Sequence, residues 1–442
     1  MVAIIGGAVA GSTAVQTLAD AGVIVIVIEQ NVRPYGKIED GLPRWHTKQR
    51  LMEYERINAR LDRPGVYFLP ATRLGKDLDF HELVNGWGLS AVILANGAWK
   101  DRPMPDDVDK YLDKGLIYQN PFIYWFNHKN EKAYSGPRYD IPPKTIVIGG
   151  GLASIDVVKA VQCELYEAAL RKRGVNVTTL ELEHKGIPAI CQAHNTNPDD
   201  LGVDDVVLYY RRRDIDMPLA QPPDNATPEQ MEKTQTVRKK ILGRVIEKYR
   251  VKFADTHLPL GPIIEGDRLA GIKFIRTKIE GGKVINLPGT EVEVRANLVI
   301  SSVGSIPEPI PGVEMKGEYY TWKDWDTGEY AKAEGVFGLG NVVTGQGNID
   351  LSRKHAASVS KMIIENYLGI GNGDRDISGV SAAAEARGQE QAEKVKDYLK
   401  SKKPLAPEKV NSILGRVSNR MKEIGYTGYR EYIRKVTPAD LE

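Results

Sequence analysis

Two stretches of this chain repeat one pattern, in which a run of β-branched residues enters a cluster of glycines and continues as a helix. The first is VAIIGGAVAGSTAV at residues 2–15, and the second is TIVIGGGLASIDVV at residues 145–158. Each is followed by another strand-like run, VIVIVIEQN at 23–31 and DDVVLYYRRR at 204–213. Continuous apolar runs of this length are typical of parallel strands buried on both faces. The repeat therefore predicts an α/β fold with two Rossmann-like, dinucleotide-binding domains.

The order of the remaining segments predicts how these domains are arranged. At 442 residues the chain is too long for one ordinary domain. We expect residues 1–110 and 331–370 to form a first domain, with residues 111–330 inserted as a second. Residues 371–442 are charged and alanine-rich, which predicts a helical C-terminal extension with a weak core. The polar, proline-rich segment 222–235 predicts an exposed loop that leads into a helix at 237–249.

Composition excludes several classes of function. Lys and Arg number 60 against 58 Asp and Glu, so no bulk charge favours nucleic acid or a membrane surface. Two cysteines, Cys163 and Cys191, are too few for an iron–sulfur cluster and lack the C-x-x-C spacing of a redox pair. His194 beside Cys191 does not make a metal site, because two ligands are insufficient. No leader or membrane span is evident, so we expect a cytoplasmic protein without a metal.

The first glycine turn carries most of what a dinucleotide pyrophosphate needs. In the pattern G-x-G-x-x-G, the first glycine permits the turn, the second lets the backbone approach the pyrophosphate and the third lets helix and strand pack closely. Gly6 and Gly11 fill the outer positions, and Ala8 adds one methyl group at the middle one. Glu29 ends the next strand, where a carboxylate can accept hydrogen bonds from a ribose diol. We expect a nucleotide here; the alternative is a tight turn without a ligand.

The second glycine turn has Gly149 and Gly151 in place and Ser154 at the third position, where a small residue suffices. The next strand ends in a run of arginines, Arg211, Arg212 and Arg213. Guanidinium groups suit a phosphomonoester, so this end predicts selection of NADPH over NADH through the 2′-phosphate. The alternative is a solvated strand end. Together the two turns predict FAD in one domain and NADPH in the other.

At these residues the chain resembles the two-dinucleotide-binding-domain flavoproteins, in the branch of adrenodoxin-type ferredoxin-NADP reductases and glutamate synthase small subunits. PYGKIEDGLP (34–43) resembles the loop that passes along the flavin, and VILANGA (92–98) resembles the strand end near the adenine half. YRRRDIDMP (210–218) resembles the segment that reads the 2′-phosphate, although its third arginine replaces a more usual acid. The resemblance assigns FAD or NADPH binding to Gly36, Gly41, Asn96, Gly97, Arg211 and Arg212.

GVFGLGNVVTGQGNID (335–350) resembles the late FAD motif of the same family. Its usual G-D pair is Gly340 and Asn341 here, and the amide can still hydrogen-bond a ribityl hydroxyl. Gly347, Asn348 and Ile349 begin the following helix. The resemblance places the N-terminus of that helix near the flavin, where a helix dipole stabilises a reduced, anionic ring.

The resemblance implies an FAD-dependent NAD(P)H oxidoreductase. NADPH would deliver a hydride to flavin N5, and electrons would leave singly for a ferredoxin-like or iron–sulfur partner, either from a free enzyme or within a multisubunit complex. One alternative is a flavin-bearing electron-relay or structural subunit with a vestigial nicotinamide site. A one-substrate FAD monooxygenase or dehydrogenase is disfavoured, because it would not need the second turn. His46 near the flavin and Asp156 near the nicotinamide are speculative catalytic candidates; their alternatives are a structural histidine and an acid that favours a helix first turn.

Overall fold

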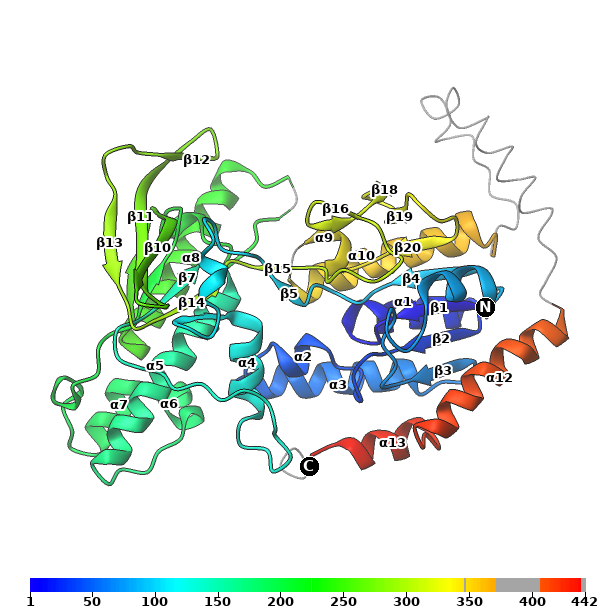
Figure 1. Cartoon of the computed structure of the whole chain (residues 1–442), viewed down its shortest axis with the longest axis horizontal. Coiled ribbons are helices and arrows are strands. Elements are labelled where there is room, and N and C mark those ends of the chain that lie inside the picture. The colour runs from blue at the N-terminus through cyan, green and yellow to red at the C-terminus, as the bar shows by residue number, and fades with distance from the viewer. Residues whose placement is uncertain (224, 346, 371–405, 439–442) are drawn as a thin grey trace. The chain divides into compact units, whose positions relative to one another are not determined.

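The computed structural model describes residues 1–223, 225–345, 347–370 and 406–438, and the chain divides into two units (Figure 1). The first contains residues 1–38, 48–100 and 306–442, and the second contains residues 39–47 and 101–305. The second unit is thus inserted in the first. It ends at Ser305 rather than at the expected residue 330, because strands after that point extend the sheet of the first unit. It also takes residues 39–47 out of the range expected for the first domain.

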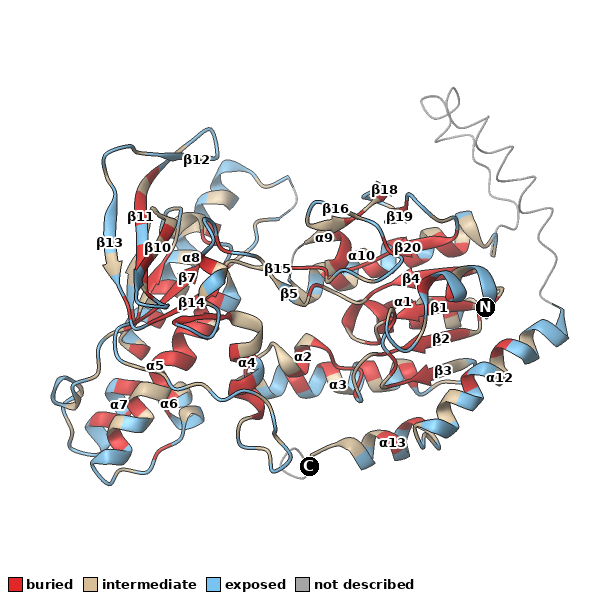
Figure 2. Cartoon of the chain, viewed as in Figure 1, coloured by how far each residue is buried: buried red, intermediate tan, exposed pale blue. Residues whose placement is uncertain are grey.

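A seven-stranded sheet forms the core of the first unit, in the order β18-β19-β20-β4-β1-β2-β3. Its strands are β1 (Val2–Ile5), β2 (Val25–Ile28), β3 (Val66–Leu69), β4 (Ala91–Leu94), β18 (Trp322–Asp324), β19 (Glu329–Tyr330) and β20 (Val336–Gly338). From β20 to β3 all pairings are parallel, and β18 and β19 add antiparallel pairs at one edge. Strands β1, β2 and β4 are buried along their whole length (Figure 2). This confirms the expectation from their continuous apolar sequences.

Helices α1 (Val9–Asp20) and α3 (Thr47–Leu61) follow β1 and β2 as crossovers, and α10 (Ile349–Met362) packs along α1. Smaller elements complete this unit: β16 (Met315–Lys316), β17 (Tyr319–Tyr320), α9 (Asn341–Thr344) and the π-helices η2 (Glu82–Gly86) and η6 (Ile363–Tyr367). Short elements also lie near the points where the chain passes from one unit to the other: α2 (Lys37–Asp40), η1 (Arg44–His46), β5 (Lys100–Asp101) and β15 (Ser305–Ile306).

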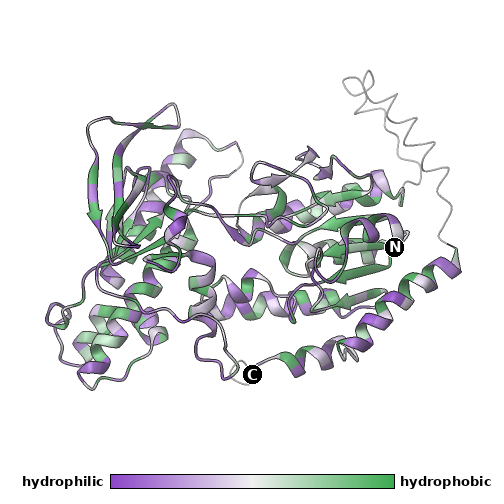
Figure 3. Cartoon of the chain, viewed as in Figure 1, coloured by the Kyte–Doolittle hydropathy of each residue, from purple (hydrophilic) through white to green (hydrophobic). Residues whose placement is uncertain are grey.

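The second unit is built on a five-stranded parallel sheet in the order β6-β14-β7-β8-β9. Its strands are β6 (Leu116–Tyr118), β7 (Thr145–Gly149), β8 (Val207–Tyr209), β9 (Lys252–Ala254) and β14 (Leu298–Ser302). A separate antiparallel sheet comprises β10 (His257–Glu265), β11 (Arg268–Glu280), β12 (Lys283–Asn286) and β13 (Val292–Arg295). Figure 3 shows the hydrophobic colouring of the parallel strands. The arrangement is the second Rossmann-like domain that the repeat predicts.

The helices of the second unit are α4 (Gln119–His128), α5 (Leu152–Lys172), α6 (Thr179–Lys185), α7 (Ile187–Ala193) and α8 (Pro228–Tyr249), with 3-10 turns η3 (Val108–Tyr111), η4 (Pro198–Leu201) and η5 (Asp214–Asp216). The expectation of a loop over residues 222–235 is wrong for its second half, because α8 begins at Pro228. Thr227 and Gln230 form a capping box there, and proline suits the first helical turn.

The described end of the chain is helical, as expected, and it contributes side chains to the core of the first unit. Helix α12 (Pro407–Glu423) contacts β3, the edge strand, and α13 (Tyr429–Val436) follows it (Figure 1). The Tyr429 ring packs against Phe68 with centroids 5.2 Å apart, and its hydroxyl donates to Asn58 Oδ1 at 2.7 Å. Residues 371–405 and 439–442 of the predicted extension lie outside the described residues. None of the helices that the structure describes has the length and apolar composition to cross a membrane.

Candidate functional site

In the first glycine turn, two glycines are required by close packing. Gly6 has φ 100°, and a Cβ there would lie 2.7 Å from the carbonyl oxygen of Ala95 on the neighbouring strand end. A Cβ on Gly11 would overlap the carbonyl oxygen of Gly6. Helix α1 then begins at Val9, and the N-cap residue Ala8 offers no side-chain acceptor to the first turn. The turn therefore leaves backbone N–H groups at a helix N-terminus, the arrangement that binds phosphate.

The methyl group of Ala8 faces the loop that follows β2. Gly36 in that loop has φ 52°, and a Cβ on it would lie only 2.9 Å from Ala8 Cβ. The absence of a side chain at Gly36 therefore makes room for the extra methyl at the middle position of the turn. Gly41, predicted in the same loop, falls in the second unit.

The carboxylate of Glu29 braces the first turn from the end of β2. Its side chain is 4% exposed, Oε2 accepts from the Gly7 N–H at 2.8 Å, and Oε1 accepts from the Asn31 N–H at 2.9 Å. The sequence predicts a partner for ribose here, and the structure adds a bond into the turn itself.

The late motif lies against the first turn. Gly340 has φ 74°, and a Cβ on it would lie 2.5 Å from Ala10 Cβ in α1. The Gly340 N–H donates to His355 Nδ1 in α10 at 3.0 Å, a contact that the sequence does not reveal. Asn341 Oδ1 is buried without a hydrogen-bond partner among the described residues. A buried acceptor of this kind needs a donor, and a ligand hydroxyl would supply one.

Asn96 shows the same chemistry at the end of β4. Its Nδ2 donates to the Tyr320 hydroxyl at 2.9 Å, whereas its Oδ1 is buried without a hydrogen bond from the part of the chain that the structure describes. The neighbouring Gly97 has φ 68°, which favours glycine. Two amide oxygens predicted to face FAD therefore lack donors among the described residues.

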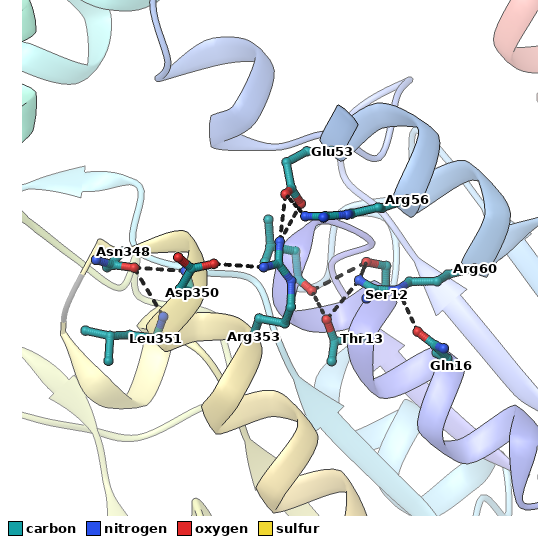
Figure 4. A network of polar contacts seen from close by, with 11 residues as sticks. Ser12, Thr13, Gln16, Glu53, Arg56, Arg60, Asn348, Asp350, Leu351 and Arg353 are labelled. Carbon is teal, nitrogen blue, oxygen red and sulfur yellow. Dashed lines mark hydrogen bonds and ion pairs between the residues drawn. The ribbon is translucent and has the colours of Figure 1, made fainter. Parts of the chain in front are cut away.

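Helix α10 begins with its own side-chain cap. Asn348 Oδ1 accepts from the N–H groups of Asp350 at 2.8 Å and Leu351 at 3.2 Å (Figure 4). The Ile349 N–H, which is predicted to face a flavin, is not part of this cap. A Cβ on Gly347 would meet only Asn341 Nδ2, at 3.9 Å.

The second glycine turn packs differently. A Cβ on Gly149 would overlap Ser154 Oγ, and Ser154 Oγ lies 3.0 Å from Ser302 O and 2.9 Å from Ser302 Oγ at the end of β14. A Cβ on Gly150 would overlap the Tyr210 ring, whereas one on Gly151 would meet nothing within 4 Å. Gly151 caps α5, and no acidic residue lies in the first turn of that 21-residue helix. The open side of the turn is therefore where the sequence predicts the pyrophosphate.

The three arginines after β8 are not equivalent. Arg213 donates from Nε and Nη2 to the two Asp216 oxygens at 2.9 and 3.0 Å, and these bonds lower the pKa of Asp216. Arg212 Nε lies 4.0 Å from Asp216 and has no hydrogen bond within the described residues. Arg211 is exposed. Asp216 thus engages mainly the arginine that the prediction left out, while Arg211 and Arg212 stay the predicted phosphate ligands.

His46 and Asp156, two separate candidates in the sequence, are partners in the second unit. His46 Nε2 lies 3.1 Å from Asp156 Oδ2, and Trp45 Nε1 and Lys159 Nζ each donate to Asp156 Oδ1 at 3.4 Å. Asp156 is outside the first turn of α5, so the explanation as a first-turn acid is wrong. His46 is 32% exposed and Asp156 14%, which leaves the imidazole accessible.

Lys159 also contacts other polar side chains near this pair. Lys159 Nζ lies 2.9 Å from Glu183 Oε1, and the Tyr249 hydroxyl donates to the same oxygen at 2.9 Å. Burial alone would raise the pKa of Glu183, but the Lys159 ion pair and the tyrosine bond lower it. The carboxylate is therefore charged and holds Lys159 in place beneath Asp156.

The two cysteines lie in the second unit. Cys163 and Cys191 are both free and buried, and burial raises the pKa of each thiol. Within the residues that the structure describes, no group of three or more His, Cys, Asp or Glu side chains could hold a metal ion.

Comparisons with known proteins agree with this architecture. No family model matches the chain. The glutamate synthase [NADPH] small chain of Mycobacterium tuberculosis is 30% identical over 171 residues, which cover 36% of this chain and 33% of the relative. The corresponding chain of Bacillus subtilis is 25% identical and covers 83% of this chain and 67% of its own length. The NADPH-Fe(3+) oxidoreductase subunit beta of Geobacter sulfurreducens is 31% identical over 36% of this chain and 22% of its own length. The chain thus spans about a third of the first of these relatives.

Among solved structures, FprA of Mycobacterium tuberculosis in complex with NADPH matches with a TM-score of 0.68 at 18% identity, over 96% of this chain and 90% of that chain. The predicted fold class, two Rossmann-like domains with the second inserted in the first, is therefore confirmed. The resemblance to the ferredoxin reductase and glutamate synthase small-chain branch is confirmed as well.

Proposed function

We propose that the chain is an FAD-dependent NAD(P)H oxidoreductase that passes electrons between NADPH and a ferredoxin-like or iron–sulfur partner protein. The observation that carries the proposal is the pairing of two open glycine turns with opposite strand ends. One turn is followed by the buried acid Glu29, and the other by the arginines Arg211 and Arg212. An acid suits a ribose diol and arginines suit a 2′-phosphate.

The residues of the first unit fit FAD on independent grounds. Asn341 Oδ1 and Asn96 Oδ1 are buried acceptors without donors among the described residues, and FAD is rich in hydroxyl groups. Gly6, Gly11 and Gly340 cannot carry side chains, so the backbone around α1 stays close and open to a pyrophosphate. Bound FAD would supply the hydride-accepting and one-electron chemistry, which amino acid side chains lack.

The residues of this chain would bind the cofactors and orient them. Arg211 and Arg212 would hold the 2′-phosphate of NADPH, and the N-terminus of α5 would hold the pyrophosphate. His46, supported by Asp156, would offer a proton-carrying group whose orientation is set by the bond at 3.1 Å. We assign it a supporting role, because hydride transfer does not require a general acid.

The electrons need a destination outside this chain. Both cysteines are buried and too few to hold an iron–sulfur cluster. Two of the relatives are named as a small chain and a subunit beta, which favours a role for this chain as one subunit of a larger complex.

Anaerobic titration of the FAD-reconstituted protein tests the proposal. We expect a yellow protein whose absorption is bleached by NADPH at lower concentration than by NADH. A yellow protein blind to both nucleotides would instead support an electron-relay subunit with a vestigial nicotinamide site. A protein that cannot be reconstituted with FAD would overturn the flavoprotein assignment, and a preference for NADH would overturn the roles of Arg211 and Arg212. Co-purification from cell extract, followed by electron transfer to the recovered iron–sulfur protein, tests the partner.

A further inference from the structure

A fully buried carboxylate lies in the helix layer of the first unit. Glu53 of α3 is 1% exposed. Arg353 of α10 donates from Nη2 to both of its oxygens at 2.7 and 2.8 Å, and Arg56 of α3 donates to Oε1 at 2.7 Å (Figure 4). A charge this deep is tolerated only with such partners, and removal of one leaves the other unpaired.

Arg353 carries this contact to the start of α10. Its other amino group, Nη1, donates to Asp350 Oδ1 at 2.8 Å in the first turn. Asp350 is in turn one of the residues whose N–H groups are capped by Asn348 (Figure 4). The side chain of Arg353 therefore connects the first turn of α10 to the body of α3.

Helix α3 also contacts α1 through an arginine side chain. Arg60 of α3 donates from Nε to Gln16 Oε1 at 2.9 Å and from Nη1 to Thr13 Oγ1 at 3.0 Å. Helix α3 thus contacts both helices that follow the predicted FAD motifs, α1 near its middle and α10 near its start. The difference is the buried charge: Arg60 meets neutral oxygens on α1, whereas Arg353 meets the buried Glu53.

We infer that Glu53 and Arg353 are positioning residues that set the place of the α10 N-terminus against the flavin. The inference rests on the proposed function. The positive end of a helix stabilises negative charge nearby, and a reduced flavin is more negative than an oxidised one. A shift of α10 away from its seat therefore weakens binding of the reduced ring more than of the oxidised ring, and this lowers the midpoint potential.

The chain offers a matched pair of variants. Arg353→Gln removes the contact between α3 and α10, whereas Arg56→Gln removes a second guanidinium from the same Glu53 oxygen without touching α10. We expect Arg353→Gln to weaken FAD binding at least tenfold relative to Arg56→Gln. We also expect it to lower the preference for reduced flavin about tenfold, which is about 30 mV for a two-electron couple. Fluorescence titration of the apoprotein gives the affinity, and equilibration with a reference dye gives the potential.

Two further variants keep the test decisive. Arg353→Lys keeps the charge but loses the geometry of a guanidinium, so its potential should lie between those of the wild type and Arg353→Gln. Glu53→Gln should shift the potential in the same direction as Arg353→Gln. Equal potentials in Arg353→Gln and Arg56→Gln, with FAD bound in both, would overturn this inference alone. A wild-type protein that binds no FAD would overturn the proposed function and the inference together.

Discussion

The two glycine turns of this chain meet one packing requirement with opposite residues. In the first, Gly11 lacks the side chain that would overlap the Gly6 carbonyl, so helix and strand meet backbone to backbone. In the second, Ser154 keeps its side chain, and Gly149 is the residue that makes room for it. The serine hydroxyl then bonds to Ser302 on the neighbouring strand. A glycine therefore occurs where two parts of the chain come close together, and its position need not follow a fixed sequence motif.

The charged residues at the two strand ends differ in the sign of their charge and in the partners that they contact. Glu29 is buried and bonds into its own turn, whereas Arg211 is exposed and Arg212 is half-buried, with no hydrogen bond to its Nε among the described residues. The first unit therefore uses its charge partly for its own architecture, whereas we propose that the second uses Arg211 and Arg212 to bind a ligand.

The largest effect should come from exchanging the third residues of the turns. Gly11→Ser places a side chain onto the Gly6 carbonyl, and we expect a loss of about 3 kcal/mol or more in the free energy of unfolding. FAD should be lost with it. Ser154→Gly removes hydrogen bonds and adds a flexible residue to a helix, for a loss of about 2 kcal/mol. Urea unfolding and flavin content of both purified variants measure the difference; equal losses would remove the contrast between the turns.

The middle position of the first turn gives the next effect. Ala8→Leu would drive its longer side chain into the Gly36 loop, and we expect a protein without flavin. Ala8→Gly keeps the space open and should retain FAD with equal or higher affinity. The absorption spectra of both variants after purification decide. Unchanged flavin content in the leucine variant would show that this turn does not hold the pyrophosphate.

The arginine end of the second turn should affect nucleotide choice rather than folding. Arg211→Ala and Arg212→Ala should each weaken NADPH binding by about tenfold or more, since a charged hydrogen bond contributes about 1.5–3 kcal/mol. NADH binding should change little. Arg213→Ala is the matched control, because Asp216 already engages that guanidinium. Binding titrations with both nucleotides check the ratio, and an equal loss for Arg213→Ala would contradict the assignment.

The smallest expected effect is a difference between the two units in how stability depends on pH. His128 in the second unit lies 2.8 Å from Glu131 and 3.1 Å from Asp40, one carboxylate at each ring nitrogen, so both nitrogens must donate. Burial alone would lower the pKa of His128, but these carboxylates raise it. Its stabilisation is complete below the ordinary pKa of about 6.5 and is lost as the pH rises through the higher folded value.

His355 in the first unit should behave in the opposite way. Its Nδ1 accepts the Gly340 N–H at 3.0 Å and must stay unprotonated, and burial lowers the pKa of His355. Its contribution is present above about pH 6.5 and is lost as the pH falls through the folded value. A pKa difference of one corresponds to about 1.4 kcal/mol. Thermal unfolding of His128→Gln and His355→Gln from pH 5 to 9, with the exposed His194→Gln as control, should show differences from the wild type that shrink at opposite ends; parallel profiles would contradict both assignments.

Local patterns were sufficient for the elements of both units. The apolar runs at residues 2–5 and 145–149 became the buried strands β1 and β7. The segment at 222–235 misled because its prolines and polar residues suggested a loop, although Thr227 and Gln230 were a readable capping signal. The average composition of that segment suggested a loop and concealed the capping interaction between these two side chains.

Contacts between distant residues could not be predicted in this way. His46 and Asp156 are 110 positions apart and meet because residues 39–47 pack with the second unit. Tyr429 reaches Asn58 across more than three hundred positions, and nothing near either residue signals the other. These pairs depend on how helices pack, and a short sequence window holds no information on that packing.

The sequence by itself determined the two βαβ units, the glycine positions and the sign of the charge at each strand end, because sterics and periodicity act within a few residues. Which distant groups those residues meet depends on the folded molecule. The fold pairs Glu29 with its own turn and Arg353 with Glu53. The physical reason is that a charge selects partners by distance in space and by burial, and both are properties of the packed molecule.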